Sequence, residues 1–282
     1  MSYAHPEVLV ETNWVADHIN DSKVRIVEVD YDPENAYNQG HIKNTGLAWW
    51  KRDINDPVAR DIIDKQRFED LMRTLGVNSD TTLVLYGDFN NWFAAFAFWV
   101  FKYYGHQDIR IMNGGRKKWE AEQRQYVKDI PAFQKTNYAA KAPNDELRAY
   151  LPEVRKIIDA KDSSFVLVDV RSPKEFSGEI TAPPEYPMEH AQRGGHIPSA
   201  KNIPWAQAVK DDGTFKSVEE LKQLYEPKGV TKEKNVIAYC RIGERSSHTW
   251  FVLKYLLGYP KVRNYDGSWT EWGNMIRNPI EK

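Results

Sequence analysis

The chain has 282 residues, of which 41% are apolar and 28% charged, so it is long enough for two domains that each bury a core. Its 39 basic and 40 acidic side chains leave a formal net charge of -1, which argues against binding to nucleic acid or to an anionic membrane surface by bulk charge. The longest nearly pure apolar run, residues 92–101, is far shorter than the roughly 20 residues that cross a bilayer, and residues 1–7 lack the basic and apolar regions of a signal peptide.

In chain order, the first half of the sequence predicts strands that alternate with helices. Residues 25–29 form a short strand that ends at Asp30, and Thr82–Tyr86 form a second strand that is apolar enough to be covered on both faces. A long apolar helix follows at residues 92–104, and Gly105 ends it as a C-cap. This alternation indicates a parallel sheet flanked by helices on both faces.

The second half of the sequence predicts the same order of elements. Residues 164–168 form a strand that ends at Asp169, Asn235–Tyr239 form an apolar central strand, and a helix follows at residues 247–257. Two further stretches, 154–160 and 218–224, have the pattern of surface helices.

The two halves are copies of one another. Residue i of the first half lies on residue i + 153 of the second half over a long stretch without a gap, so that Tyr86 meets Tyr239 and Trp119 meets Trp272. Recurrent Gly, Trp and Tyr identities in one frame indicate a tandem duplication. We therefore predict an α/β protein of two similar domains, at residues 1–135 and 146–282, with a polar linker at 136–145.

Cys240 stands where chemistry is expected in such a fold. It is the first residue after the strand Asn235–Tyr239, and parallel α/β sheets bind ligands at the carboxyl ends of their strands. The loop after it enters a helix, whose first N–H groups attract negative charge. Arg241 and Arg245 add positive charge that favours the nucleophilic thiolate, and Gly243 permits the necessary turn. Although a lone cysteine is usually a small buried apolar residue, this position predicts a reactive one.

The cysteine count and the motifs exclude several classes of protein. One thiol forms neither an intrachain disulfide nor a cysteine-based zinc site, which excludes disulfide scaffolds and zinc ribbons. Metal-ligand spacings and dinucleotide fingerprints are absent from the sequence, so we expect neither a metal nor a cofactor. The lack of disulfides and of a signal peptide predicts a cytoplasmic protein.

The first copy lacks the residues that predict a reactive cysteine and an anion-binding loop in the second copy. Gly87 stands at the place of the cysteine, and Asp88 stands at the place of Arg241. Counted from the strand-end aspartates, Asp32 lies opposite Arg171. Because an anion-binding loop does not survive the exchange of cations for anions, the N-terminal domain is predicted to be catalytically inactive.

Taken together, these features resemble the rhodanese family of sulfurtransferases over nearly the whole chain. The matching motifs are Asp169-Val170-Arg171-Ser172, Gly195-His196-Ile197-Pro198-Ser199-Ala200, the Cys240 loop, and the stretch from Gly267 to Trp272. The resemblance is to two-domain thiosulfate sulfurtransferases of the bacterial type. It implies two rhodanese-like domains, of which the N-terminal one is inactive and the C-terminal one is catalytic.

The resemblance also implies a mechanism and a set of site residues. In this family the loop cysteine takes a sulfane sulfur from thiosulfate as a persulfide, and passes it to cyanide, giving thiocyanate and sulfite overall, or to a thiol. Cys240 would be the nucleophile and Arg171 would bind the donor anion, while the substrate-binding loop comprises Arg241, Ile242, Gly243, Glu244 and Arg245. Some members carry a lysine at the position of Ile242, and Arg245 is expected to supply that charge. A thioredoxin-like dithiol protein is a candidate acceptor.

Loop length and composition decide among related activities. Four residues separate Cys240 from Arg245, one fewer than in the Cys-x5-Arg loop of cysteine phosphatases, and Ser246 stands where the phosphatase arginine would be. Loops with the sequence Cys-Gly-Ser-Gly-Val-Thr act on 3-mercaptopyruvate, whereas the two arginines here favour the dianion thiosulfate. The alternatives that stay open are a 3-mercaptopyruvate sulfurtransferase and a persulfide carrier that serves a protein partner without turnover.

His41 and His196 recur at equivalent positions of both halves, including the half without a nucleophile. A residue that the inactive copy keeps is more readily explained by the fold than by catalysis. We therefore expect both histidines to hold a turn by hydrogen bonds and not to act as general bases.

Overall fold

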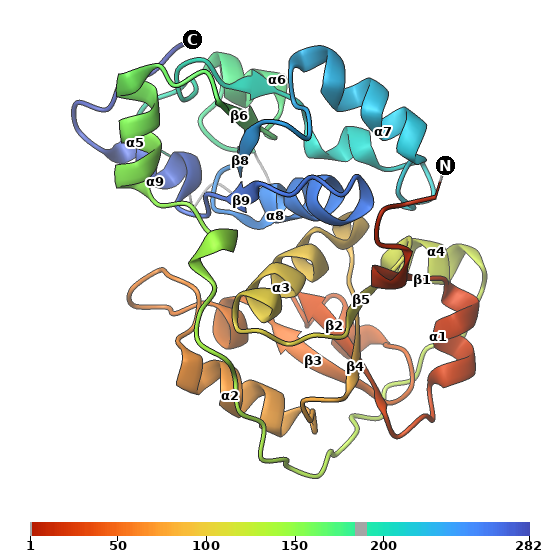
Figure 1. Ribbon diagram of the computed structural model, residues 1–282. Helices are drawn as coiled ribbons and strands as arrows, with labels where there is room; N and C mark the ends of the chain where they lie inside the picture. The colour runs from red at the N-terminus through yellow and green to blue at the C-terminus, as the bar shows by residue number, and fades with distance from the viewer. Residues whose placement is uncertain (1, 184–190) are drawn as a thin grey trace. The chain divides into compact units, whose positions relative to one another are not determined.

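The computed structural model describes residues 2–183 and 191–282, and the chain divides into two compact units (Figure 1). The N-terminal unit consists of Glu7–Asn144 and Val209–Phe215, and the C-terminal unit consists of Met1–Pro6, Asp145–Ala208 and Lys216–Lys282. Each unit thus contains a short segment from the other half of the sequence.

The described residues of the N-terminal unit form a five-stranded sheet with the order β1-β5-β4-β2-β3, in which every neighbouring pair is parallel. Its strands are β1 Leu9–Val10, β2 Val24–Asp30, β3 Thr45–Trp49, β4 Thr82–Tyr86 and β5 Ile109–Met112. Its helices are α1 Thr12–His18, α2 Lys65–Thr74, α3 Trp92–Tyr103 and α4 Gly115–Ala121.

The apolar helix α3 shows why this half of the sequence folds as it does. All of its residues except Trp92 and Lys102 are buried, and it packs against β2, β4 and β5 (Figure 1). The central strand β4 is covered as well, since its residues from Leu83 to Tyr86 are buried. Burial on both faces accounts for a strand and a helix that are apolar all round.

The described residues of the C-terminal unit form a four-stranded parallel sheet with the order β7-β6-β8-β9. Its strands are β6 Phe165–Asp169, β7 Lys201–Asn202, β8 Asn235–Tyr239 and β9 Val262–Asn264. Its helices are α5 Leu151–Ala160, α6 Pro173–Ser177, α7 Val218–Tyr225, α8 Glu244–Phe251 and α9 Ser268–Asn274. The predicted α/β class, with two repeated parallel sheets flanked by helices, is confirmed.

The helix after β8 begins earlier than the sequence pattern indicates. We expected it at residues 247–257, but α8 starts at Glu244 and continues after Phe251 as a π-helical turn, Val252–Leu256. The expectation was wrong because Glu244, Arg245 and Ser246 are polar residues of a kind that is typical of a loop. They are nevertheless buried and form the first helical turn.

The N-terminal residues belong to the C-terminal unit through hydrogen bonds to its π-helical turn. The N–H groups of Ala4 and His5 donate to the carbonyl oxygens of Leu256 and Tyr255, at 2.9 and 3.0 Å. The hydroxyl of Tyr3 donates to the carbonyl oxygen of Lys216 at 2.9 Å. The bonds to Leu256 and Tyr255 satisfy carbonyls that a helix end leaves without an intrahelical partner.

The segment after α4 runs in an extended conformation along α2 of the N-terminal unit. Arg73 Nε donates to the carbonyl oxygen of Tyr138 at 3.0 Å, and the N–H of Ala140 donates to Glu69 Oε1 at 3.0 Å. Tyr138 is buried. Most of the stretch that the sequence marks as a linker is therefore packed onto the N-terminal unit.

Both recurrent histidines hold turns, as predicted. The ring of His41 stacks on Tyr37 and hydrogen-bonds the carbonyl oxygens of Tyr37 and Asp129. The ring of His196 stacks on Phe176 and hydrogen-bonds the carbonyl oxygen of Phe176 at 2.9 Å.

Candidate active site

Cys240 lies at the carboxyl end of β8, and its side chain is fully buried. The N–H of Gly243 donates to Cys240 Sγ at 3.1 Å. Gly243 has φ +102°, and a Cβ built there would lie 2.7 Å from the Cβ of Asp266. Glycine is therefore required at this position, both for the left-handed backbone and for the space. The turn that it permits directs a backbone N–H to the sulfur.

A second segment, at the start of α9, holds the backbone of the cysteine. Ser268 Oγ accepts the N–H of Cys240 at 3.0 Å, and the N–H of Trp269 donates to the carbonyl oxygen of Cys240 at 3.1 Å. Ser268 has φ +54°, a left-handed conformation that is uncommon for a residue with a Cβ and costs about 1–3 kcal/mol. Sequence reasoning missed Ser268. The available signal was Gly115, which stands at the same place of the first copy and also has a positive φ.

Two polar side chains of α8 approach the sulfur. Ser246 Oγ lies 3.7 Å and Glu244 Oε2 lies 3.8 Å from Cys240 Sγ. The hydroxyl of Ser246 is 2.6 Å from Asn264 Oδ1, so its single hydrogen is used there and not on the sulfur. The carboxylate of Glu244 is an acceptor for the hydrogen of a thiol at this position.

Arg245 forms a bidentate ion pair with Glu175 of α6. Its two terminal nitrogens each lie 2.9 Å from a carboxylate oxygen of Glu175, and both side chains are buried. Burial alone would raise the pKa of Glu175, but the charge and hydrogen bonds of Arg245 outweigh it and lower this pKa to about 2. We expected Arg245 to offer its charge to a donor anion, yet the structure commits this guanidinium to Glu175.

Arg171 is similarly engaged. Its Nη2 lies 2.6 Å from Asp169 Oδ2 and donates to the carbonyl oxygen of Gly195 at 2.7 Å, while its guanidinium stacks over the ring of Trp269. The side chain is buried, with 1% of its surface exposed. Among the described residues, Arg171 Nη1 is buried without a hydrogen-bond acceptor, so it is the one part of this side chain that remains available to an anion.

Arg241 and Ile242 complete the loop, and both are buried, at 5% and 3% exposure. The carbonyl oxygen of Arg241 accepts the N–H of Thr270 at 3.0 Å, which fixes the backbone directly after the cysteine. All five predicted loop residues, 241–245, are thus buried beside the cysteine, and Gly243 and Glu244 contact its sulfur.

The charges of the site nearly cancel. Of the three arginines, Arg171 is paired with Asp169 and Arg245 with Glu175, and a third carboxylate, that of Glu244, lies beside the sulfur. The positive charge that a donor anion meets is therefore smaller than the two arginines of the loop suggest. Fixed N–H groups, such as that of Gly243 at 3.1 Å from the sulfur, can stabilise an anion at this position whatever the net charge of the side chains.

The corresponding loop of the N-terminal unit is filled by a side chain. Asn91 Oδ1 accepts the N–H of Gly87 at 3.0 Å, and Asn91 Nδ2 donates to the carbonyl oxygen of Met112 at 2.8 Å. In the repeat frame Asn91 corresponds to Glu244. In the first unit the side chain of Asn91 accepts the N–H of Gly87. In the second unit the equivalent N–H, that of Cys240, is accepted by Ser268, and this leaves room in the loop for the sulfur atom.

Strand register corrects one sequence alignment. In the first sheet Glu28 pairs with Tyr86, and in the second Asp169 pairs with Tyr239. Because the two tyrosines are equivalent in the repeat, Glu28 and not the strand-end aspartate is the counterpart of Asp169.

The counterpart of Arg171 is accordingly Asp30, and our alignment with Asp32 was wrong by two residues. The error arose because both strands end in a similar sequence with an aspartate, whereas the pairing with neighbouring strands decides which residues of the two sheets are equivalent. Asp30 is buried, and burial raises its pKa to about 6, while burial raises the pKa of Asp88 to about 7. Acidic groups still replace cations in the first unit.

Within residues 2–183 and 191–282, no group of three or more His, Cys, Asp or Glu side chains is arranged to hold a metal ion. Over the same residues, none of the helices combines the length and the apolar character that a membrane span requires.

A family model described as "Rhodanese-like domain" matches residues 11–122 and 151–275. The chain is 57% identical over 283 residues to "Sulfur carrier protein TtuD" of Thermus thermophilus, a match that covers 100% of this chain and 99% of that protein. It is 51% identical over 278 residues to a protein of Mycolicibacterium smegmatis named "Putative thiosulfate sulfurtransferase", with 99% of both chains covered.

Solved structures give a similar result. The wild-type structure of EanB matches with a TM-score of 0.87 and 25% identity, over 99% of this chain and 70% of that one. A structure of an EanB variant with a cysteine persulfide and ergothioneine matches with a TM-score of 0.88 and 25% identity, over 99% of this chain and 71% of the other.

Proposed function

Because the chain belongs to the rhodanese family of sulfurtransferases, we propose that it is a thiosulfate sulfurtransferase that works through a persulfide on Cys240. The observation that carries the proposal is the loop after β8, in which the single cysteine of the sequence receives the N–H of Gly243 on its sulfur. Relatives at 51% identity that are named for thiosulfate support the choice of donor.

The proposed reaction has two steps. The Cys240 thiolate attacks the outer sulfur of thiosulfate, an S–S bond forms on the enzyme, and sulfite leaves with the electron pair of the broken S–S bond. Cyanide then attacks the terminal sulfur of the persulfide, so that thiocyanate leaves and the thiolate is restored. A thiol acceptor attacks the same sulfur and leaves as a persulfide.

The residues of the loop have different tasks in this proposal. The N–H of Gly243 and the N-terminal end of α8 stabilise the thiolate and the persulfide anion. Arg241 and Arg171, the latter through Nη1, bind the sulfonate oxygens of the donor. Ile242 and Glu244 line the loop, and Arg245 holds it to α6 through Glu175.

The first experiment tests the nucleophile. After incubation with thiosulfate, mass spectrometry of the wild type is expected to show a protein one sulfur atom heavier, and Cys240→Ser is expected to gain no mass and to have no thiocyanate-forming activity. Glu179→Gln, which breaks an exposed ion pair with Lys174, is the matched control and should behave as the wild type. Persulfide or activity in Cys240→Ser would refute the assignment.

The second experiment tests the donor. Steady-state rates with thiosulfate and with 3-mercaptopyruvate are compared on the same protein with cyanide as acceptor. We expect the higher kcat/KM for thiosulfate. A higher value for 3-mercaptopyruvate would replace the proposed donor and leave the persulfide route intact.

A second candidate function is that of a persulfide carrier for a protein partner. The relative at 57% identity is named as a sulfur carrier protein, which favours this candidate specifically. A carrier transfers one sulfur per cysteine to its partner and turns over slowly on small molecules, whereas an enzyme completes many cycles on thiosulfate and cyanide. Counting thiocyanate per protein molecule over an hour separates the two.

The proposal also covers the acceptor and the compartment. A thioredoxin-like dithiol protein suits the acceptor role because its second thiol attacks the inner sulfur of the persulfide formed on its first thiol, which closes a disulfide and releases the transferred sulfur as sulfide. A reducing cytoplasm suits a protein whose single cysteine must return to the thiolate after each cycle.

A further inference from the structure

Three fully buried polar side chains lie beside the cysteine loop, where α8 packs against β8 and β9 (Figure 1). Ser246 and Ser247 belong to the first turn of α8, and Asn264 is the last residue of β9. We call these three residues the loop clamp. Burial of polar side chains costs free energy unless they are hydrogen-bonded, so their partners show what the clamp holds.

The hydrogen bonds of the clamp converge on one backbone atom, the carbonyl oxygen of Gly243. Ser247 Oγ donates to this oxygen at 2.7 Å, and Asn264 Nδ2 donates to it at 3.2 Å. The backbone N–H of Ser247 donates to the same oxygen at 3.0 Å. Because a carbonyl oxygen has two lone pairs, this one is fully engaged, and the carbonyl turns only if several bonds break together.

The side-chain amide of Asn264 has one orientation in the clamp. Its Oδ1 accepts the hydroxyl of Ser246 at 2.6 Å, and its Nδ2 donates to Ser247 Oγ at 2.9 Å. A flipped amide would set Oδ1 against the carbonyl oxygen of Gly243 at 3.2 Å, and two acceptors at this distance repel each other. Asn264 is thus the residue that joins both serines to the loop.

Gly243 depends on such bonds because its backbone has little stiffness of its own. It has φ +102°, and it lacks the Cβ that restricts rotation in other residues. Its N–H donates to Cys240 Sγ at 3.1 Å, and its carbonyl is held by the clamp. In a planar trans peptide the next N–H, that of Glu244, points away from this carbonyl. The clamp therefore sets the direction of the N–H groups that stabilise an anionic sulfur.

The N-terminal unit shows that the fold itself does not need polar side chains here. Strand register pairs Leu85 with Ile111 in the first sheet and Ala238 with Asn264 in the second, so Ile111 is the counterpart of Asn264. In the repeat frame the three places of the clamp hold apolar and buried residues, which are Phe93, Ala94 and Ile111. The copy without a cysteine has carbon where the copy with the cysteine has hydroxyl and amide groups.

We infer that Asn264 is a positioning residue of the sulfur-transfer reaction, which fixes the peptide after Gly243 so that the loop presents its N–H groups to the sulfur of Cys240. Ser247 acts with Asn264 on the same carbonyl oxygen. The inference rests on the proposed persulfide route, but it does not depend on which donor supplies the sulfur, because the clamp holds the loop and not the donor anion.

Two variants remove donors of the clamp and leave the hydroxyl of Ser246 on its acceptor. Asn264→Asp keeps the shape and the oxygen that accepts from Ser246, but it sets a second oxygen against the carbonyl of Gly243. Ser247→Ala removes the hydroxyl that donates to the same carbonyl, and Ala94 shows that alanine fits this place of the fold. Since Ser247→Ala adds no charge, it separates the loss of a donor from the effect of a new carboxylate, and it keeps the test decisive if Asn264→Asp fails to fold.

Rapid-quench mass spectrometry measures the rate constant and the amplitude of persulfide formation with thiosulfate. The amplitude depends on the fraction of the protein that is folded, whereas the rate constant does not. Each variant is expected to lower the maximal rate constant about tenfold, with an amplitude near one sulfur atom per chain. The thiosulfate concentration that gives half of this rate should change less than about twofold, because other groups bind the donor.

The double variant tests whether the two residues act through one atom. Because Asn264 and Ser247 hold the same carbonyl oxygen, the combined loss of rate should be smaller than the product of the two single losses. A loss equal to the product would show independent roles and contradict the shared carbonyl.

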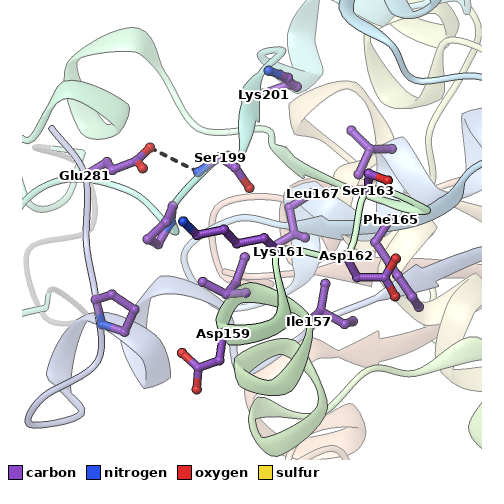
Figure 2. A pocket seen from close by; sticks show the side chains of 14 residues that line it. Ile157, Asp159, Lys161, Asp162, Ser163, Phe165, Leu167, Ser199, Lys201 and Glu281 are labelled. Carbon is purple, nitrogen blue, oxygen red and sulfur yellow. Dashed lines mark hydrogen bonds between the residues drawn. The ribbon is translucent and has the colours of Figure 1, made fainter.

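The matched control is the same exchange at a buried asparagine away from the loop. Asn278 hydrogen-bonds Arg155 and the carbonyl oxygen of Trp272. The next residue, Pro279, lines a pocket of about 610 Å3 beside the first residues of β6 (Figure 2). Strands β6 and β8 are parallel and in register, so this is the end of the sheet opposite to the cysteine. Asn278→Asp should form the persulfide at the rate of the wild type.

The outcomes separate this inference from the proposed function. Unchanged rate constants in both variants, with a wild type that forms the persulfide, would overturn the inference and leave the proposed function intact. A lower amplitude at an unchanged rate constant would give the clamp a structural role only, and would overturn it as well. A wild type that gains sulfur from 3-mercaptopyruvate and not from thiosulfate would refute the proposed donor, and the same comparison with 3-mercaptopyruvate then decides. Absence of the persulfide with both donors would refute the proposed function and this inference with it.

Discussion

The ion pair between Arg245 and Glu175 joins the cysteine loop to α6, and Glu175→Gln tests how much it stabilises the C-terminal unit. The substitution keeps the shape of the side chain but leaves the guanidinium of Arg245 buried without its counter-charge. Breaking a buried pair in this way costs about 3–5 kcal/mol. The pKa of Glu175 gives an independent estimate: a fall from 4.5 to about 2 corresponds to about 3 kcal/mol.

The sign of the pH dependence follows from the lowered pKa of Glu175. The stabilisation by the ion pair is fully present above pH 4.5, where the carboxyl group is ionised even in the unfolded chain, and it is lost as the pH falls toward 2. The difference in unfolding free energy between the wild type and Glu175→Gln should therefore be about 3 kcal/mol at pH 7 and less than half of that at pH 3.

Urea unfolding of both proteins, followed by tryptophan fluorescence at pH 7 and pH 3, measures this difference. Glu179→Gln removes the exposed pair with Lys174 from the same part of the chain, and is expected to change the stability by less than about 1 kcal/mol. A loss below 1 kcal/mol for Glu175→Gln at pH 7, or a loss of the same size at both pH values, would refute the reasoning.

Three further predictions follow from the geometry around the sulfur. Arg171→Ala and Arg241→Ala should each lower kcat/KM about tenfold to a hundredfold with thiosulfate and less with 3-mercaptopyruvate, because the second donor carries less charge near the transferred sulfur; equal losses with the two donors in steady-state assays would contradict the role of these arginines in binding the donor anion. Ser268→Gly removes the acceptor of the Cys240 N–H and relieves a positive φ, so kcat should fall while the urea midpoint does not; an unchanged kcat would mean that this hydrogen bond does not position the sulfur. Gly243→Ala forces a Cβ into a left-handed position and a 2.7 Å contact, so we expect the variant to lose more than about 1 kcal/mol of stability and to form no persulfide. Full persulfide loading of this variant by mass spectrometry would contradict the need for glycine at this position.

Much of the architecture could be predicted from the sequence because it rests on local patterns. Strands β4 and β8 are apolar runs bounded by polar residues, and α3 is too long and too apolar to be a strand. The duplication strengthened each assignment, since a pattern seen twice in one frame must suit both copies. Cys240 was found in the same way, from its position directly after a buried strand.

The partners of the site residues were not predictable in this way. Arg245 and Glu175 are separated by 70 positions, and Cys240 and Ser268 by 28, so that no periodicity links them. The sequence places positive residues in the loop, but only the packing of α6 against it shows that the charge of Arg245 is already matched.

The sequence by itself determined the α/β class, the tandem repeat and the position of the one cysteine, because these depend on the order of residues along the chain. Tertiary structure alone decided the register that sets Arg171 opposite Asp30, the hydrogen bond from Cys240 to Ser268, and the packing of the Phe133 ring against the guanidinium of Arg25. These features depend on the distance between residues that folding brings together. That distance follows from the packing of whole helices and strands. An ion pair or a packed ring forms only when folding brings both partners into contact.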